Sequence, residues 1–434
     1  MLHLPARSLA RAVLAAGLMI VPGAAALAAP LAVNAPPASG QGEALGGAYR
    51  AGLAALVAGR LDEAQQSFEA ATKADPRSAA PLLGLAEVAL QRKKPYDALA
   101  RIRQALTVAP NDSAAHASMG RYLAMTGNVK DAEQSLRKAI ELDDRSMRPR
   151  MDLADVLSSQ KRWPEAAALY QAVIGAEPTH AGAHYALGLA YAQLGRADDA
   201  RTALLKSAEL DPKAPLPHVA LARWHGGRKE FPQALASVGK ALERNPKSVD
   251  ALLLRGDLLD ASGDVAAAVG AYEKAAQALP GQPAPLLRVA MLHHRQGDTA
   301  KALPIYIKAA DLDPKNPLVL NNIADIYSQR KDGLADAERW ANKALAVAPK
   351  SAEVLDTLGW IQRAKGNLTA ARTSLEKASQ FDPSSGETLY RLAQVQADLG
   401  DKAKARQSLQ AAMKAKSPIA SAEAARKLQA ELGG

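Results

Sequence analysis

The chain has 434 residues and a formal net charge of +10, and it contains no cysteine. The lack of cysteine excludes disulfides, zinc–thiolate sites, iron–sulfur clusters, thiol nucleophiles and a lipidated cysteine anchor. Basic residues are spread along the chain with acids between them, so the positive charge favours anionic partners weakly and indicates no particular one.

Residues 1–28 have the pattern of a secretory signal peptide. Arg7 and Arg11 precede a mostly apolar stretch without acids, which ends in the small-x-small sequence Ala26-Leu27-Ala28 that signal peptidase accepts. A membrane anchor is the competing interpretation, but the stretch is short for a spanning helix and a Pro-Gly pair interrupts it. We therefore expect cleavage after Ala28, a periplasmic or secreted mature chain, and no transmembrane segment after cleavage.

Residues 29–44 are rich in Ala, Pro and Gly and predict a flexible leader, after which the sequence repeats with a period of 34 residues. Most repeats close on a proline, which stops a helix because the residue before a proline avoids the α region. The prolines of this ladder are Pro76, Pro110, Pro178, Pro212, Pro246, Pro280, Pro314, Pro349 and Pro383.

Each repeat predicts a helical hairpin. Two apolar stripes with helical spacing are separated by a turn that usually contains glycine, and a small residue recurs early in the first stripe, as at Gly120 and Gly256. Small residues at fixed positions let two helices approach closely, where a leucine would overpack at a cost of roughly 1–3 kcal/mol. The ninth repeat holds one extra residue near 330–334, which we expect inside its hairpin turn.

This skeleton of small residues and closing prolines resembles the tetratricopeptide repeat family over residues 45–418. The resemblance implies an all-α, right-handed solenoid of about eleven hairpins over residues 45–420, with a concave groove lined by the first helix of each hairpin. Residues 421–434 resemble the helix that caps such arrays. The expected role is to hold other molecules rather than to catalyse a reaction.

Motifs for catalysis, cofactors or metals are not found. The sequence has no GxSxG nucleophile motif, no GxxxxGK[ST] phosphate loop and no HExxH zinc motif. His116, His184 and His218 occupy an early position of their repeats where other repeats carry leucine, so we expect these rings to fill the core. We therefore expect no enzyme activity, no cofactor and no metal.

The last three repeats hold the best candidate for a specific site. Trp360 occupies a groove position of the family, where its ring can stack on a sugar face or anchor a peptide. The alternative is that Trp360 packs between neighbouring hairpins and meets no ligand. The groove positions predict the following partner-binding residues: Asn321, Asn322, Asp325, Asp356, Trp360, Tyr390 and Arg391.

The same region carries a second resemblance. The segments LNNIADIY (320–327), NKALAVAPKSAEVLDTLGW (342–360) and LYRLAQ (389–394) are similar to periplasmic tetratricopeptide proteins of exopolysaccharide export and exosortase (PEP-CTERM) systems. With the export signal, this implies a scaffold for other envelope proteins. Direct binding of an acidic polysaccharide or a peptide in the groove is the alternative. Nucleic acid is not expected as a partner, because the chain is exported and few aromatic residues occupy groove positions.

Overall fold

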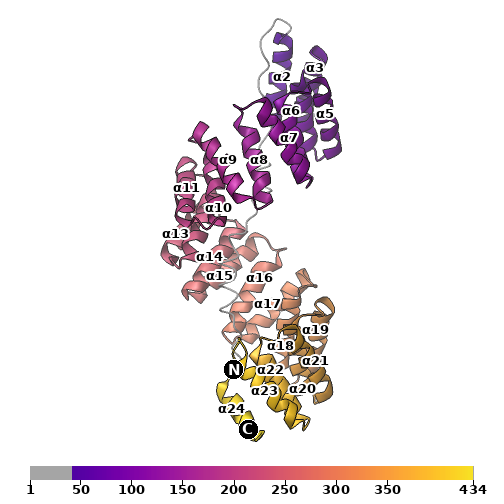
Figure 1. Cartoon of the computed structure of the whole chain (residues 1–434), viewed down its shortest axis with the longest axis vertical. Coiled ribbons are helices and arrows are strands. Elements are labelled where there is room, and N and C mark those ends of the chain that lie inside the picture. Colours follow the sequence, from indigo (N-terminus) through magenta and orange to yellow (C-terminus); the bar gives the residue numbers. More distant parts are fainter. Residues whose placement is uncertain (1–41, 434) are drawn as a thin grey trace. The chain divides into compact units, whose positions relative to one another are not determined.

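The computed structural model describes residues 42–433, which form 23 helices and no β-strand (Figure 1). The all-α fold predicted from the sequence is thereby confirmed for this part of the chain. The described residues divide into two compact units, 42–228 and 229–433, which we call the N-terminal unit and the C-terminal unit. The predicted signal peptide, residues 1–28, and residues 29–41 of the predicted leader lie outside the described residues.

The N-terminal unit consists of five helical hairpins followed by one further helix. In each hairpin a first helix packs against a second helix, which in turn packs against the first helix of the next hairpin. First helices also contact one another, α2 with α4, α4 with α6 and α6 with α8. The helices are α2 (Gly42–Val57), α3 (Leu61–Ala74), α4 (Ala79–Gln91), α5 (Pro95–Val108), α6 (Ser113–Met125), α7 (Val129–Leu142), α8 (Met147–Ser159), α9 (Trp163–Ala176), α10 (Ala181–Gln193), α11 (Ala197–Leu210) and α12 (Pro215–Gly227).

The C-terminal unit begins with α13, continues with five hairpins and ends with α24. Helices α12 and α13 correspond to the sixth repeat of the sequence, so the five hairpins of this unit are numbered 7 to 11. Their first helices are α14, α16, α18, α20 and α22. The helices are α13 (Phe231–Arg244), α14 (Val249–Ser262), α15 (Val265–Ala278), α16 (Pro283–Arg295), α17 (Thr299–Leu312), α18 (Pro317–Ser328), α19 (Leu334–Val347), α20 (Ala352–Ala364), α21 (Leu368–Phe381), α22 (Gly386–Asp398), α23 (Lys402–Lys414) and α24 (Ala422–Glu431).

Small residues in the first helices allow the close approach within each hairpin. A Cβ atom added to Gly256 would lie 2.3 Å from the Tyr272 ring, and one added to Gly120 would lie 2.5 Å from Leu136. Tyr272 and Leu136 come from the second helices of the same hairpins and are almost fully buried. The predicted reason for the small residues, avoidance of overpacking, is thus confirmed.

The hairpin turns show one feature that the sequence pattern did not predict. Most turns place glycine in the left-handed region, as at Gly127 with φ 81°. The equivalent position is a lysine in three turns, and Lys93, Lys161 and Lys229 adopt φ values of 59°, 61° and 62°. A residue with a Cβ atom is disfavoured there by roughly 1–2 kcal/mol, so these turns carry backbone strain.

Three boundary expectations can be compared with the structure. The turn between α18 and α19 spans residues 329–333, longer than its neighbours, which confirms that the extra residue of the ninth repeat lies there. Helix α2 begins at Gly42, so residues 42–44 of the predicted leader are helical, in accord with the good helix propensity of Glu and Ala. The placement of His116, His184 and His218 in the core was wrong. All three residues are partly exposed, and the Nε2 atoms of His116 and His184 lie 2.9 Å and 3.0 Å from proline carbonyl oxygens of the preceding linkers.

A backbone pairing joins the last hairpin to the segment before α24. The Gly386 N–H donates to the carbonyl oxygen of Ser417 at 3.0 Å, and the Ser417 N–H donates to that of Ser384 at 3.1 Å. A Cβ atom on Gly386 would lie 2.4 Å from the Ser417 oxygen, so this approach requires glycine. Leu428 and Leu432 then bury the apolar side of α24 against the preceding hairpin.

Across residues 42–433, every helix is too short or too polar to cross a membrane.

Candidate functional site

The predicted binding residues lie on three first helices that contact one another in series. Helix α18 packs against α20, and α20 packs against α22. On one helix, residues three or four apart share a side, so Asn321 and Asp325 lie together on α18, and Asp356 and Trp360 lie together on α20. We call the surface formed by these positions of α18, α20 and α22 the first-helix face.

The seven predicted residues are not equally accessible on this face. Asn321, Asn322 and Tyr390 are buried, with exposed fractions of 4%, 6% and 8%. The other four, Asp325, Asp356, Trp360 and Arg391, are partly exposed. The accessible part of the predicted site is therefore made of charged groups and one indole ring.

The centre of the face is an ion pair between neighbouring hairpins. Nη1 of Arg391 donates to Oδ2 of Asp356 at 2.5 Å, and Nε of Arg391 lies 3.4 Å from Oε1 of Glu387. Burial raises the pKa of the Asp356 carboxyl, while Arg391 acts in the opposite direction. The pair therefore compensates a carboxylate that its surroundings would otherwise leave poorly solvated.

Two guanidinium groups lie over the Trp360 ring. The Cζ atom of Arg363 is 4.7 Å from the centre of this ring, and that of Arg391 is 5.0 Å away. Nε of Arg363 donates to Oδ2 of Asp398 at 2.6 Å. Trp360, Arg363, Ala364 and Asp398 line an open pocket of about 270 Å³, so one edge of the tryptophan borders a space that a ligand group could enter.

The carboxylate of Asp325 extends the face towards α16. Its Oδ2 atom accepts a hydrogen bond from Nε2 of Gln329 at 3.0 Å and lies 3.4 Å from Nε2 of His294. The His294 ring makes an edge contact with Tyr306, with ring centres 6.0 Å apart. Gln329, His294 and Tyr306 were not predicted to be part of the site.

Charged groups of successive first helices pair at two regular spacings. Partners 35 residues apart are Asp356–Arg391, Arg363–Asp398 and Asp260–Arg295. Partners 31 residues apart are Arg121–Asp152 at 3.4 Å and Asp257–Arg288 at 3.6 Å. The two spacings differ by about one helical turn. Opposite charges on neighbouring first helices therefore meet when they are separated by one residue more than the repeat length, or by three residues fewer. This spacing is the signal that could have identified Arg363 and Asp398 from the sequence.

The N-terminal unit holds a second buried polar group, on α6, α8 and α9. Asp152 lies 3.0 Å from Arg148, and the Tyr170 hydroxyl donates to Oδ1 of Asp155 at 2.6 Å. Burial raises the pKa of Asp155 to about 7, although the hydrogen bond from Tyr170 opposes this shift. We regard this group as structural, because its polar side chains are paired with one another, Asp152 with Arg148 and with Arg121 of α6, and Asp155 with Tyr170.

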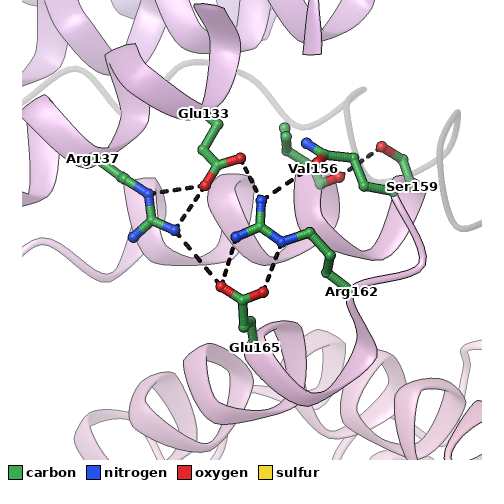
Figure 2. A network of polar contacts seen from close by, with 7 residues as sticks. Glu133, Arg137, Val156, Ser159, Arg162 and Glu165 are labelled. Carbon is green, nitrogen blue, oxygen red and sulfur yellow. Dashed lines mark hydrogen bonds and ion pairs between the residues drawn. The ribbon is translucent and has the colours of Figure 1, made fainter. Parts of the chain in front are cut away.

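Figure 2 shows a different arrangement, in which second helices are joined by partly exposed charges. Arg162, at the start of α9, donates to Glu133 of α7 and to Glu165 of α9, each at 2.6 Å, and Arg137 donates to Glu133 at 2.7 Å. Burial opposes the change, but the hydrogen bonds from Arg137 and Arg162 lower the pKa of Glu133. These charges satisfy one another, so the network fastens α7 to α9 and offers no unpaired group to a ligand.

Comparison with known proteins agrees with the hairpin architecture. Three family models, each described as a tetratricopeptide repeat, match residues 55–122, residues 151–215, 219–283 and 357–418, and residues 285–316. Among curated proteins, the chain is similar to the human protein O-mannosyl-transferase TMTC3, with 28% identity over 194 residues. The match covers 41% of this chain and 21% of that protein, so the chain spans about a fifth of the length of this relative.

Several solved structures are also similar. Yeast Tom70 is 14% identical, with a TM-score of 0.42 and coverage of 90% of this chain and 95% of that chain. A tetratricopeptide repeat protein from Parabacteroides merdae is 17% identical, with a TM-score of 0.46 and coverage of 57% and 98%. YrrB, described as a tetratricopeptide protein with an unusual peptide-binding site, is 22% identical, with a TM-score of 0.36 and coverage of 44% and 98%.

Proposed function

This chain belongs to the tetratricopeptide repeat family, and from that premise we propose that it is a non-catalytic scaffold that binds partner proteins on the first-helix face of its C-terminal unit. The observation that carries the proposal is the position of Trp360. Its ring contacts two guanidinium groups and borders an open pocket. A partly exposed tryptophan among charged groups is typical of the residues that dominate protein interfaces.

We further propose that the scaffold acts outside the cytoplasm, in an envelope assembly or an exopolysaccharide export system. Support comes from the signal pattern of residues 1–28 and from the resemblance of the last repeats to periplasmic proteins of that kind. The name of the similar human protein refers to mannosyl transfer, but the match covers only 21% of that protein. For this chain we propose binding without catalysis. Cell fractionation with N-terminal sequencing tests export, and a cytoplasmic chain that retains Met1 would contradict it.

Site-specific photo-cross-linking tests the binding role. A benzoylphenylalanine at Gln394, which is partly exposed on α22, should capture a partner protein in the native cell. The same group at Glu376, partly exposed on second helix α21, should capture that partner poorly. Trp360→Ala should reduce the yield at Gln394 while the helical circular dichroism stays unchanged. Unchanged capture by the folded variant would exclude Trp360 from the interface.

Direct binding of an acidic polysaccharide is a second candidate. It is favoured by the net charge of +10 and by the two arginines beside Trp360, since an indole ring can stack on a sugar. Retention of the purified chain on an anionic glycan column should then fall as salt rises, because the attraction between exposed charges is screened. Retention that does not depend on salt would exclude this electrostatic binding.

A further inference from the structure

The first-helix face carries a charge opposite to that of the chain. Helices α18, α20 and α22 together carry five carboxylates and two guanidinium groups, whereas the whole chain is positive by ten charges. The carboxylates are those of Asp325, Glu353, Asp356, Glu387 and Asp398, and the guanidinium groups are those of Arg363 and Arg391. Both arginines are already engaged, Arg363 with Asp398 and Arg391 with Asp356, which leaves the remaining acids in excess.

Three of these carboxylates act on one another across α18 and α20. The Glu353 side chain reaches the surface, yet packing around its carboxyl and the charges of Asp356 and Asp325 raise its pKa. Glu353 forms no ion pair or hydrogen bond with another described residue. Arg391 compensates only Asp356, so a second cation placed between Asp325 and Glu353 would relieve the remaining repulsion.

Buried acceptors beside these acids also lack donors. Asn321 is only 4% exposed, and its Oδ1 atom has no hydrogen-bond donor among the described residues. Oδ1 of Asp356 is likewise buried and has no donor in hydrogen-bond geometry, while the nearby Thr388 hydroxyl and Arg391 act on the same carboxyl. Asn321 lies one turn before Asp325 on α18, and Asp356 lies on the neighbouring first helix α20. The Oδ1 atoms of Asn321 and Asp356 therefore both belong to the acidic region of the face. A Lys or Arg side chain has several donors and no acceptor, which is the complement of this arrangement.

We infer that the acidic part of the first-helix face binds a basic segment of the partner, with Lys or Arg side chains seated among Asp325, Glu353 and Asp356. This inference rests on the proposed scaffold function and gives the chemistry of the partner. Neighbouring helices are about 8–10 Å apart, and an extended chain advances about 3.3 Å per residue. Basic residues at every third position would therefore meet successive hairpins.

The N-terminal unit lacks this excess of acids. At the equivalent first-helix positions of the N-terminal unit, three acids accompany four arginines. The acids are Glu87, Asp152 and Asp155, and the arginines are Arg50, Arg121, Arg148 and Arg223. A basic segment should therefore select the C-terminal unit.

Fluorescence anisotropy with labelled nonapeptides tests the inference on the full chain. A peptide with lysine at every third position in an alanine background should bind at low salt and dissociate as salt rises. The matching glutamate peptide should bind much more weakly. The variant Asp325→Asn/Glu353→Gln should weaken binding of the lysine peptide roughly tenfold. The control Asp311→Asn/Glu273→Gln makes the same charge change on exposed second-helix positions of the same unit and should leave the affinity within roughly twofold.

In the peptide assay, two results would overturn the inference: equal binding of the glutamate peptide, or unchanged affinity of the folded Asp325→Asn/Glu353→Gln variant. Its failure can be told apart from failure of the scaffold proposal. A partner that cross-links through Gln394 by an acidic or neutral segment would overturn the basic-segment inference alone. Absence of any cross-linked partner would instead overturn the scaffold proposal.

Discussion

Asp356 and Arg391 form an ion pair that joins α20 to α22, with Oδ2 and Nη1 2.5 Å apart and both side chains largely buried. Removing Arg391 would leave a buried carboxylate without its counter-charge. We expect Arg391→Met to lower the free energy of unfolding by roughly 3 kcal/mol, because an uncompensated buried charge is strongly destabilising. Urea unfolding followed by circular dichroism measures the change.

The double variant Asp356→Asn/Arg391→Met is the control for this prediction. It removes both charges together, so most of the lost stability should return. A double variant as unstable as Arg391→Met alone would show that packing by the arginine, and not its charge, holds α20 and α22 together.

Gly256 tests the close approach inside a hairpin. Gly256→Ala should lower the unfolding free energy by roughly 1–3 kcal/mol, since the new Cβ atom would lie 2.3 Å from the Tyr272 ring. Gly239→Ala in α13 is the matched control, because no atom lies within 4 Å of its added Cβ. The control should gain up to about 1 kcal/mol from helix propensity alone. Thermal melting that shifts both variants in the same direction would contradict the packing argument.

The lysines with positive φ give a reciprocal pair of substitutions. Lys93→Gly should raise the unfolding free energy by roughly 1 kcal/mol, because glycine adopts φ near 59° without strain. Gly127→Lys, at the equivalent position of the next hairpin, should lower it by a similar amount. Urea midpoints measure both changes. A loss of stability in Lys93→Gly would show that the lysine side chain makes a contact stronger than the backbone strain.

Asp155 predicts a dependence of stability on pH. Its pKa is raised to about 7 in the folded chain, against about 3.9 in the unfolded chain. Between these values the folded state binds more protons than the unfolded state, so the free energy of unfolding should fall as pH rises from about 4 to 7. Arg148, Asp152, Tyr170 and Ser158 surround Asp155 and set the size of the effect.

The variant Asp155→Asn removes this titration while it keeps an oxygen to accept from the Tyr170 hydroxyl. At pH 8 it should be more stable than the parent by on the order of 1–3 kcal/mol, and the difference should shrink towards pH 4. Melting temperatures at several pH values measure it. Asp198→Asn, on the exposed surface of α11, serves as the control and should change little at any pH. A lower melting temperature for Asp155→Asn at pH 8 would count against the prediction.

The repeat period accounts for most of what could be predicted. Prolines, small residues and turn glycines placed the hairpins, because these residues limit the backbone or the distance between helices whatever the surroundings. Polar side chains were harder to place. Asp356 and Arg391 were predicted as separate ligands for a partner, but they bind each other. Their pairing depends on how one hairpin is turned against the next, which residue spacing within a single hairpin does not specify.

The histidines show the same limit on a smaller scale. His116 stands at a position that carries leucine elsewhere, and an apolar role was the simplest interpretation. Its Nε2 atom instead lies 2.9 Å from the Pro110 carbonyl oxygen, which a helix-ending proline leaves without a helical donor. Whether a linker carbonyl lies within reach of a histidine can be judged only when the path of the linker is known.

The pairing between Gly386 and Ser417 has a practical consequence for experiments on shortened chains. It makes residue 417 part of the eleventh hairpin, although the second helix of that hairpin ends at Lys414. A protein truncated just after α23 would lose the acceptor for the Gly386 N–H at the start of α22, close to Glu387 and Arg391. Fragment boundaries chosen by counting repeats would therefore disturb the face where a partner is sought, and a fragment should retain the chain at least through Pro418.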